Sequence, residues 1–104
     1  MKIFVKRPGK APEEMEIKNT LKDWQELVGG YIETVTITDD FVLICNEEGL
    51  LNDSKFNCWF MGMQFFGTIA FCGVEEDNFA DVPIDYETFK RVMPNEWWEV
   101  EECR

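Results

Sequence analysis

The side chains of this sequence that could do chemistry are mostly carboxylates, gathered in three clusters: Asp39-Asp40, Glu47-Glu48 and Glu75-Glu76-Asp77. Carboxylates in loops can bind Ca²⁺, but no cluster has the spaced D-x-D-x-D-G-x₅-E pattern of a calcium loop. Solvated turns are the simpler interpretation of each cluster alone. Set across one face of a rigid sheet, the same carboxylates would imitate the phosphates of a nucleic acid.

Several kinds of catalytic site are excluded by residue type. The chain has no histidine, which removes Ser-His-Asp and Cys-His nucleophilic sites and every His-containing metal site. The four cysteines, at 45, 58, 72 and 103, are spread singly without the paired spacing of a zinc site. No phosphate-binding glycine loop or nucleophile elbow is present. We expect a non-enzymatic protein without catalytic residues, metal or cofactor.

The net charge of −11 narrows the choice of partner. Basic residues dominate positions 1–22 and acidic residues dominate the rest, so most of the chain repels nucleic acid and anionic lipid and favours a basic protein. For any single acidic residue, solubility is a sufficient explanation. Apolar residues make up 45% of the chain, yet no run is long enough to cross a membrane and no signal peptide is visible. We expect a cytoplasmic protein that binds neither membranes nor nucleic acid directly.

Two further segments could contact a partner. Residues 50–58, LLNDSKFNC, have no clear period and are expected to be the longest irregular connection, so Asn52 and Asp53 would lie on a binding loop. Trp97 and Trp98 would point to opposite faces of a strand, so one of them would be an interface anchor; a core lid formed by a returning strand is an equal alternative. Met61, Met63 and Phe65 are more typical of a core than of a cofactor site.

The pattern of apolar residues predicts one α+β domain over residues 1–94, an antiparallel sheet packed by two short helices, followed by an acidic, Trp-containing tail over 95–104. Thr20 and Gly29 are the expected ends of the first helix, and Asp85 and Pro94 those of the second. The segment 60–74 predicts one bent strand or two short ones. The other predicted strands are 2–6, 14–18, 31–38 and 41–45, and a short segment at 79–82 precedes the second helix.

Parts of the sequence resemble a known family. MKIFVKRPGKAPEEMEI at the start, LVGGYIETVTI followed by VLICNEEG, and GTIAFCGVEEDNFADVPIDYETFKRVMP near the end look like a family of small uncharacterised proteins of phages and mobile elements. The likeness covers residues 1–94, and GGYIE followed by CNEEG is its signature. Residues 52–63 depart from the usual form, which implies a specialised partner. The resemblance implies no catalytic residue.

These observations favour an acidic binding protein that inhibits a basic host defence nuclease, such as a CRISPR effector or a restriction enzyme. A module that sequesters a small ligand or nucleotide, and a structural accessory of a mobile element, are the alternatives. The oligomeric state is left open. The expected partner-binding residues are Asp39, Asp40, Glu47, Glu48, Asn52, Asp53, Glu75, Glu76, Asp77, Trp97 and Trp98.

Overall fold

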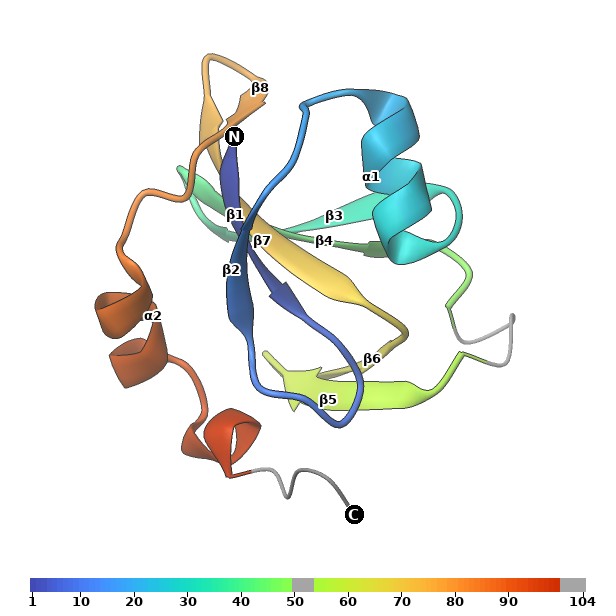
Figure 1. The fold of residues 1–104 in the computed structure, drawn as a ribbon, viewed down its shortest axis with the longest axis vertical. Coiled ribbons are helices and arrows are strands. Elements are labelled where there is room, and N and C mark those ends of the chain that lie inside the picture. The colour runs from blue at the N-terminus through green and yellow to red at the C-terminus, as the bar shows by residue number, and fades with distance from the viewer. Residues whose placement is uncertain (50–53, 100–104) are drawn as a thin grey trace.

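A six-stranded antiparallel sheet forms the middle of the molecule (Figure 1). The computed structural model describes residues 1–49 and 54–99. The strand order is β2-β1-β7-β4-β3, and β8 pairs with β7. This arrangement confirms the predicted α+β fold with an antiparallel sheet and two short helices. The strands of the sheet are β1 (Lys2–Lys6), β2 (Glu13–Glu16), β3 (Ile32–Thr38), β4 (Phe41–Asn46), β7 (Ile69–Glu75) and β8 (Asn78–Ala80).

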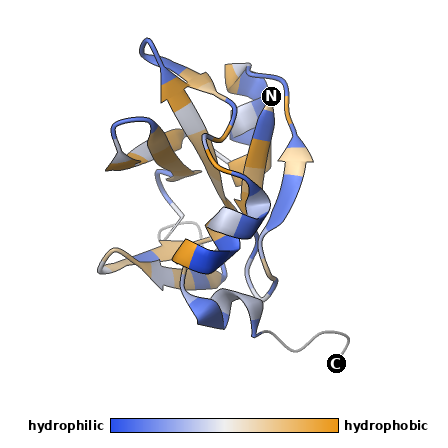
Figure 2. Cartoon of the chain, turned by 90° about the vertical axis from the view of Figure 1, so that its left-hand side faces the viewer, coloured by the Kyte–Doolittle hydropathy of each residue, from blue (hydrophilic) through white to orange (hydrophobic). Residues whose placement is uncertain are grey.

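Four further elements cover the sheet: the helices α1 (Leu21–Val28) and α2 (Tyr86–Val92), the 3₁₀ helix η1 (Asn95–Trp98), and the separate hairpin of β5 (Phe56–Phe60) and β6 (Met63–Phe66). Hydrophobic residues concentrate along the central strands, with more polar residues on the outer turns (Figure 2). No helix in the described residues is long and apolar enough to span a bilayer.

Side chains alternate between two cores, one on each face of the sheet, as successive residues of a strand must. One cluster lies under α1 and includes Ile3, Val5, Trp24, Val28, Val42, Ile44, Ala70 and Cys72. The other is rich in aromatic side chains and includes Phe4, Phe41, Leu43, Cys58, Phe65, Phe71, Phe89 and Trp97. Because both faces are covered, the central strands are buried along nearly their whole length.

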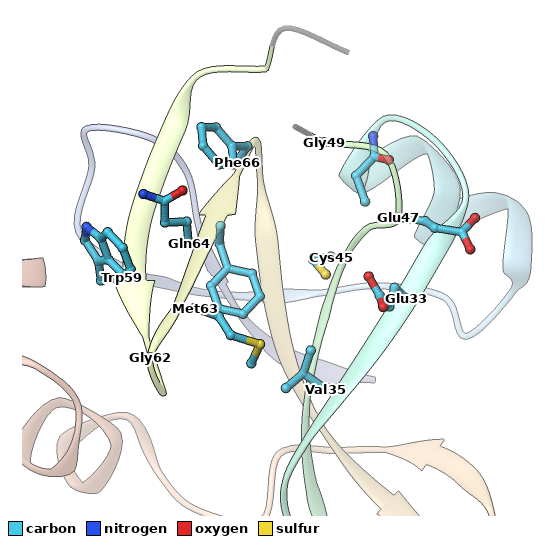
Figure 3. A pocket seen from close by; sticks show the side chains of 12 residues that line it. Glu33, Val35, Cys45, Glu47, Gly49, Trp59, Gly62, Met63, Gln64 and Phe66 are labelled. Carbon is cyan, nitrogen blue, oxygen red and sulfur yellow. The ribbon is translucent and has the colours of Figure 1, made fainter. Parts of the chain in front are cut away.

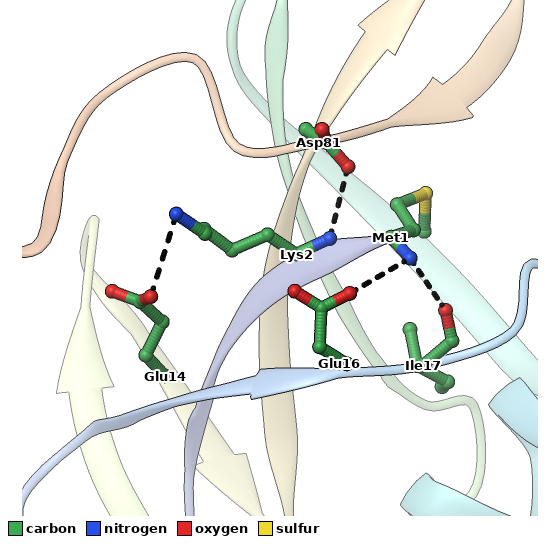
Figure 4. Close-up of polar contacts among 6 residues, drawn as sticks. All are labelled: Met1, Lys2, Glu14, Glu16, Ile17 and Asp81. Atoms are coloured by element: carbon green, nitrogen blue, oxygen red, sulfur yellow. Dashed lines mark hydrogen bonds and ion pairs between the residues drawn. The ribbon is translucent and has the colours of Figure 1, made fainter.

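Strand β1, predicted at 2–6, is buried on both faces. Ile3 and Val5 are buried on one face and Phe4 and Lys6 on the other, because both faces of the sheet are covered. Its first residues are tied to distant parts of the chain (Figure 4). The amino group of Met1 donates to the backbone oxygen of Ile17, N···O 3.0 Å, and the backbone N–H of Lys2 donates to the Asp81 carboxylate, N···O 2.9 Å. These bonds join β1 to the segments that follow β2 and β8.

Helix α1 has the predicted ends. The Thr20 hydroxyl accepts from the backbone N–H of Asp23, N···O 3.1 Å, and Gly29 ends the helix in the left-handed conformation, at φ 85°. Trp24 and Val28 are buried, whereas Leu21, at helical spacing from both, is 60% exposed. The helix therefore contacts the sheet through a narrow stripe.

Helix α2 begins where Asp85 accepts from the backbone N–H of Thr88, N···O 2.8 Å. Phe89 and Met93 are buried, and Val92, the alternative to Met93 on this face, is 61% exposed. The next residues form η1, so the start of the predicted tail is a 3₁₀ helix packed on the aromatic core, and neither a strand nor a solvated extension.

The β5–β6 hairpin corrects two expectations about the middle of the chain. Residues 56–58, placed in an irregular connection by the sequence, belong to β5. The segment 60–74 contains two strands, β6 and β7, which agrees with the second of the two predicted forms. The two-residue turn between β5 and β6 has positive φ at both Met61 and Gly62, 54° and 74°, as a type I′ turn requires.

Candidate partner-binding surface

Most of the predicted acidic residues meet at one end of the central sheet. The β3–β4 turn carries Asp39 and Asp40, strand β7 ends at Glu75, and the β7–β8 turn carries Glu76 and Asp77. The two turns are neighbours because β4 pairs with β7: Phe41 lies opposite Gly73, and the N–H of Val74 donates to the backbone oxygen of Asp40, N···O 3.0 Å. Folding thus gathers clusters that are far apart in the sequence into one acidic end, made of these five residues.

The acidic end is built from exposed turns. Glu76 and Asp77 both have positive φ, 52° and 67°, in a tight two-residue turn, and the Thr38 hydroxyl donates to the Asp40 carboxylate, O···O 2.9 Å. Among the described residues, no lysine or arginine lies within 4.0 Å of these carboxylates. In the same part of the chain, no group of three or more His, Cys, Asp or Glu side chains could hold a metal ion. This end can attract a basic molecule but offers little to pack against.

The remaining predicted acids, Glu47 and Glu48, follow β4 at the opposite end of the sheet. The N–H of Glu47 donates to the backbone oxygen of Tyr31, N···O 2.8 Å, and that of Glu48 to the Asn46 side chain, N···O 2.8 Å. Strand β4 has six residues, so it separates the two acidic groups by roughly 15–20 Å. The predicted carboxylates therefore do not form one continuous face.

A groove lies beside Glu47, between the β3–β4 side of the sheet and the β5–β6 hairpin (Figure 3). Its volume is about 590 Å³. Glu33 and Glu47 line it from the sheet side, and Trp59 and Met63 line it from the hairpin side. The Glu33 carboxylate points toward the hairpin, whereas the Glu47 carboxylate and the Trp59 ring point away from the groove (Figure 3). Within the described residues, neither carboxylate has a basic side chain within 4.0 Å. The groove therefore combines unneutralised negative charge with an apolar wall.

The apolar wall belongs to a hairpin with an unusually hydrophobic outer surface. Its inner side packs into the aromatic core through Cys58 and Phe65. The hairpin exposes large apolar side chains, with exposed fractions of 57% for Trp59, 51% for Met61, 44% for Phe56 and 39% for Met63. The prediction that Met61 and Met63 belong to the core is therefore wrong. Met61 is in the turn and Met63, which pairs with Phe60, lines the groove, which leaves only Phe65 of that trio in the core.

The floor of the groove contains a thiol with little reactivity at neutral pH. Cys45 lies opposite Glu33 in the β3–β4 pairing and is buried. Burial, helped by the nearby Glu33 carboxylate, raises the pKa of the Cys45 thiol to about 11. Because the thiolate is the reactive form, Cys45 contributes apolar surface and no nucleophile at pH 7.

The two predicted tryptophans, Trp97 and Trp98, pack against the aromatic core. Trp97 is 3% exposed and packs on Phe71, with ring centroids 5.8 Å apart. Trp98 is partly buried and donates from its indole N–H to the Tyr86 hydroxyl, N···O 2.8 Å. Trp97 thus has no surface to offer a protein partner. The pair covers the core, as in the alternative prediction, but from a 3₁₀ helix and not from a returning strand. Asn52 and Asp53 lie outside the described residues.

The fold and this surface define a class: a small α+β domain with an antiparallel sheet and an acidic groove walled by an exposed hairpin. The family model for DUF3846, a domain of unknown function, matches residues 1–93, and the chain belongs to this family. No curated protein and no solved structure matches it. The expected resemblance to a domain of unknown function is confirmed, over nearly the expected span.

Proposed function

We propose that this protein is a non-enzymatic binding domain that holds a basic, partly apolar segment of a protein partner in the groove between β3–β4 and β5–β6. One observation carries the proposal: a groove of about 590 Å³ has the Glu33 carboxylate on its sheet side and Met63 on its hairpin side, and Glu47 and Trp59 lie at its edges. A lysine or arginine of the partner would pair with the carboxylates while its apolar neighbours cover the exposed hairpin. Aromatic and methionine side chains are enriched in such contacts.

The rest of the molecule supports a basic partner. The net charge is −11, and the acidic end at Asp39, Asp40 and Glu75–Asp77 adds long-range attraction without close contact. Charges of this kind raise association rates and depend strongly on salt. The groove would then provide the specific contacts and the acidic end the steering.

The finer proposal concerns the partner's identity. Resemblance to phage and mobile-element proteins, together with the charge, supports inhibition of a basic host defence nuclease, such as a CRISPR effector or a restriction enzyme, in the host cytoplasm. Basic segments that normally contact nucleic acid phosphates are the natural occupants of an acidic groove. This proposal needs no catalytic residue in the chain.

The groove is tested with a fluorescently labelled peptide that alternates arginine or lysine with leucine, and binding is followed by anisotropy at low and high salt. Glu33→Gln with Glu47→Gln should weaken binding several-fold, up to about tenfold, by removing two exposed ion pairs. Glu75→Gln with Glu76→Gln changes the net charge equally at the acidic end and should have a much smaller effect on affinity. Trp59→Ala should weaken binding by more than about tenfold, as loss of an anchor does.

Equal weakening by the two double variants would overturn the groove as the contact site and leave only general charge attraction. The finer proposal is tested separately, by DNA cleavage with a panel of purified CRISPR effectors and restriction enzymes in the presence of the protein. Inhibition that is lost in the Glu33→Gln, Glu47→Gln variant would support a nuclease partner. Unchanged cleavage across the panel, with peptide binding intact, would reject the nuclease and keep the groove.

A further inference from the structure

The edge of the sheet at β3 has no partner strand. The strand order places β3 at one end of the sheet, where it pairs with β4 alone among the described residues. Its sequence is IETVTIT, in which every residue but the glutamate is β-branched, the type that most favours extended backbone. It contains neither the proline nor the lysine that commonly blocks an edge.

The pairing of β3 with β4 shows which backbone groups face this free edge. The N–H of Glu47 donates to the backbone oxygen of Tyr31, N···O 2.8 Å, and the register of the two strands sets these residues opposite each other. In antiparallel strands, residues bonded to the partner alternate with residues whose N–H and C=O point away. The odd-numbered residues of β3 therefore bond β4, and Ile32, Thr34 and Thr36 direct both groups to the free edge. Elsewhere in the described part of the chain, no backbone group bonds them.

The other end of the sheet is protected against an added strand, and β3 is not. Strand β2, at that end, has four residues, and three of them are glutamates. Short length and charged side chains are the usual protection of an edge strand. Strand β3 has seven residues, a single charged side chain, Glu33, and an irregular register only near its end, between Thr36 and Thr38. It is therefore the edge that can accept another strand.

Charge determines which strand fits. Glu33 lies near the start of β3, and Asp39 and Asp40 follow its end directly. No lysine or arginine occurs between Lys22 and Lys55 in the sequence. If a second copy paired antiparallel with β3, the start of each strand would lie beside the acidic end of the other, and the copies would repel each other. A basic segment would instead find a carboxylate beside each of its ends.

We propose that the partner's basic segment binds as an extended strand, hydrogen-bonded to the free edge of β3, with a lysine or arginine near each end and β-branched residues between them. This proposal rests on the proposed function, because alternate side chains of the added strand would stand beside Glu33 and Val35, which line the groove. The other side chains would stand beside the exposed Thr34 and Thr36. Extended backbone from Glu33 to Asp39 spans roughly 20 Å, so a segment of about seven residues reaches both acidic ends.

This mode of binding is tested with a fluorescently labelled peptide, Arg-Thr-Val-Thr-Ile-Thr-Arg, and two N-methylated forms of it, with binding followed by anisotropy. One form is methylated on its threonines, and the other on its valine, isoleucine and last arginine. The two sets alternate along a strand, so only one set of N–H groups faces β3. One form should bind at least about tenfold more weakly than the parent peptide, and the other within about twofold of it.

The direction of the added strand follows from the weaker form. With an arginine beside Glu33, loss of binding in the threonine-methylated form assigns antiparallel pairing to Thr34 and Thr36, and loss in the other form assigns parallel pairing. Equal binding of both forms, or no binding of the parent peptide, would overturn strand addition.

The groove is judged separately, with the parent peptide and the Glu33→Gln, Glu47→Gln variant. Weakening in this variant together with equal binding of the methylated forms would keep the groove and reject the strand. Unchanged affinity in this variant, with one methylated form still weak, would keep the strand and reject the groove.

The free edge can also be blocked from the protein side. Thr34→Pro removes an N–H that faces the edge and keeps the bonds to β4, because proline is tolerated at such positions of edge strands. It should weaken the parent peptide at least about tenfold, whereas the matched Thr34→Ala, which keeps the N–H, should stay within about twofold of wild type. Thermal unfolding shows whether each variant is folded. Equal effects of the two substitutions in folded protein would overturn the proposal.

Hydrogen exchange of the wild-type protein gives a readout that needs no variant. Peptide binding should slow exchange of the Thr34 and Thr36 amides and leave those of Glu33 and Val35, already bonded to β4, unchanged. Absence of slowing at Thr34 and Thr36 would overturn strand addition. Sedimentation of the protein alone should show a monomer, and a dimer that Thr34→Pro dissociates would assign the edge to a second copy instead.

Discussion

The two faces of the central sheet are covered in different ways. Under α1, one helix and mostly aliphatic side chains close the core, with Trp24 and Phe79 as an edge-to-face pair at 5.4 Å. The other face is covered by three separate pieces, α2, η1 and the β5–β6 hairpin, which meet on a network of aromatic rings centred on Phe71.

This difference explains where the groove and a smaller cavity lie. Separate pieces leave gaps where they meet each other and the sheet, whereas the hollow of about 440 Å³ on the α1 side is lined by Met1 and residues 16–19 and not by α1 itself. The groove lies where the hairpin meets β3–β4, and the smaller cavity, of about 210 Å³, lies where the hairpin meets η1 and β1. The aromatic face thus provides both a core and the candidate binding cavities of this domain.

Removing the Phe71 side chain should have the largest effect and tests whether the two faces of the sheet are covered independently. Its ring lies 5.0 Å from that of Phe89 in α2, 5.8 Å from that of Trp97 in η1 and 6.1 Å from that of Phe60 in the hairpin. Phe71→Ala should lower the free energy of unfolding by about 3–5 kcal/mol, measured by urea denaturation. Amide hydrogen exchange should quicken in all three pieces and change less in α1. Uniform quickening across both faces would show that the two coverings are not independent.

A smaller effect is expected at the clamp that closes the α1 face. The Asn46 side chain is buried, donates to the backbone oxygen of Val28, N···O 3.2 Å, and accepts from the N–H of Glu48. Asn46→Ala leaves the Val28 oxygen without this bond and should destabilise the fold by about 1–3 kcal/mol, again by urea denaturation.

The exposed Asn78, whose amide donates to the backbone oxygen of Glu76, is the control for this clamp. Asn78→Ala should stay within about 0.5 kcal/mol of the wild type. If Asn46→Ala changed the free energy of unfolding as little as Asn78→Ala, apolar packing alone would hold α1 on the sheet. The two Asn46 hydrogen bonds would then not be needed for it.

The smallest expected effect is a pH dependence of stability that distinguishes the cap of α2 from the cap of α1. The backbone N–H of Thr88, followed by the Thr88 hydroxyl and then Arg91, lowers the pKa of Asp85 below its ordinary 3.8. A carboxylate with a lower pKa in the folded state stabilises the fold above the unfolded pKa, and this stabilisation is lost as pH falls through the folded value. Between pH 5 and 3 the wild type should therefore lose its advantage over Asp85→Asn, measured by thermal unfolding.

Thr20 is the matched control at α1, because it caps the helix with a neutral hydroxyl. Thr20→Ala should cost about 1 kcal/mol at every pH in this range. The stability difference between Thr20→Ala and wild type should not change with pH. If it changed as the difference between Asp85→Asn and wild type does, the effect of acid would not be specific to the α2 cap.

The helices could be predicted because their signals are local. Thr20, Gly29 and Asp85 act on neighbouring backbone groups, and their residue types alone favour those positions. The acidic end could be predicted only as loops: that Asp40 and Glu75 belong together depends on β4 pairing with β7, a contact between distant segments. The burial of Lys6 was missed for a similar reason, because it follows from a second covering over β1 that no local pattern indicates.

The hairpin, the groove and the smaller cavity were missed for a more specific physical reason. Two-residue hairpin turns are usually marked by Asn-Gly or Asp-Gly, and here the turn is Met61-Gly62, which looks like part of an apolar run. The irregular register at Asn57 then disrupts the alternation that would have marked β5. The available signal for the hairpin was Gly62, which follows a short aromatic run. A turn placed at Gly62 would also have put Trp59 on the exposed side of the hairpin.

Trp59 is shared by the groove and the smaller cavity, since this one residue lines both. A molecule that moved β5 at Trp59 in one site would alter the shape of the other. Thermodynamic linkage would then require reciprocity: if occupancy of the smaller cavity changed the affinity of the groove by some factor, occupancy of the groove would change the affinity of the cavity by the same factor.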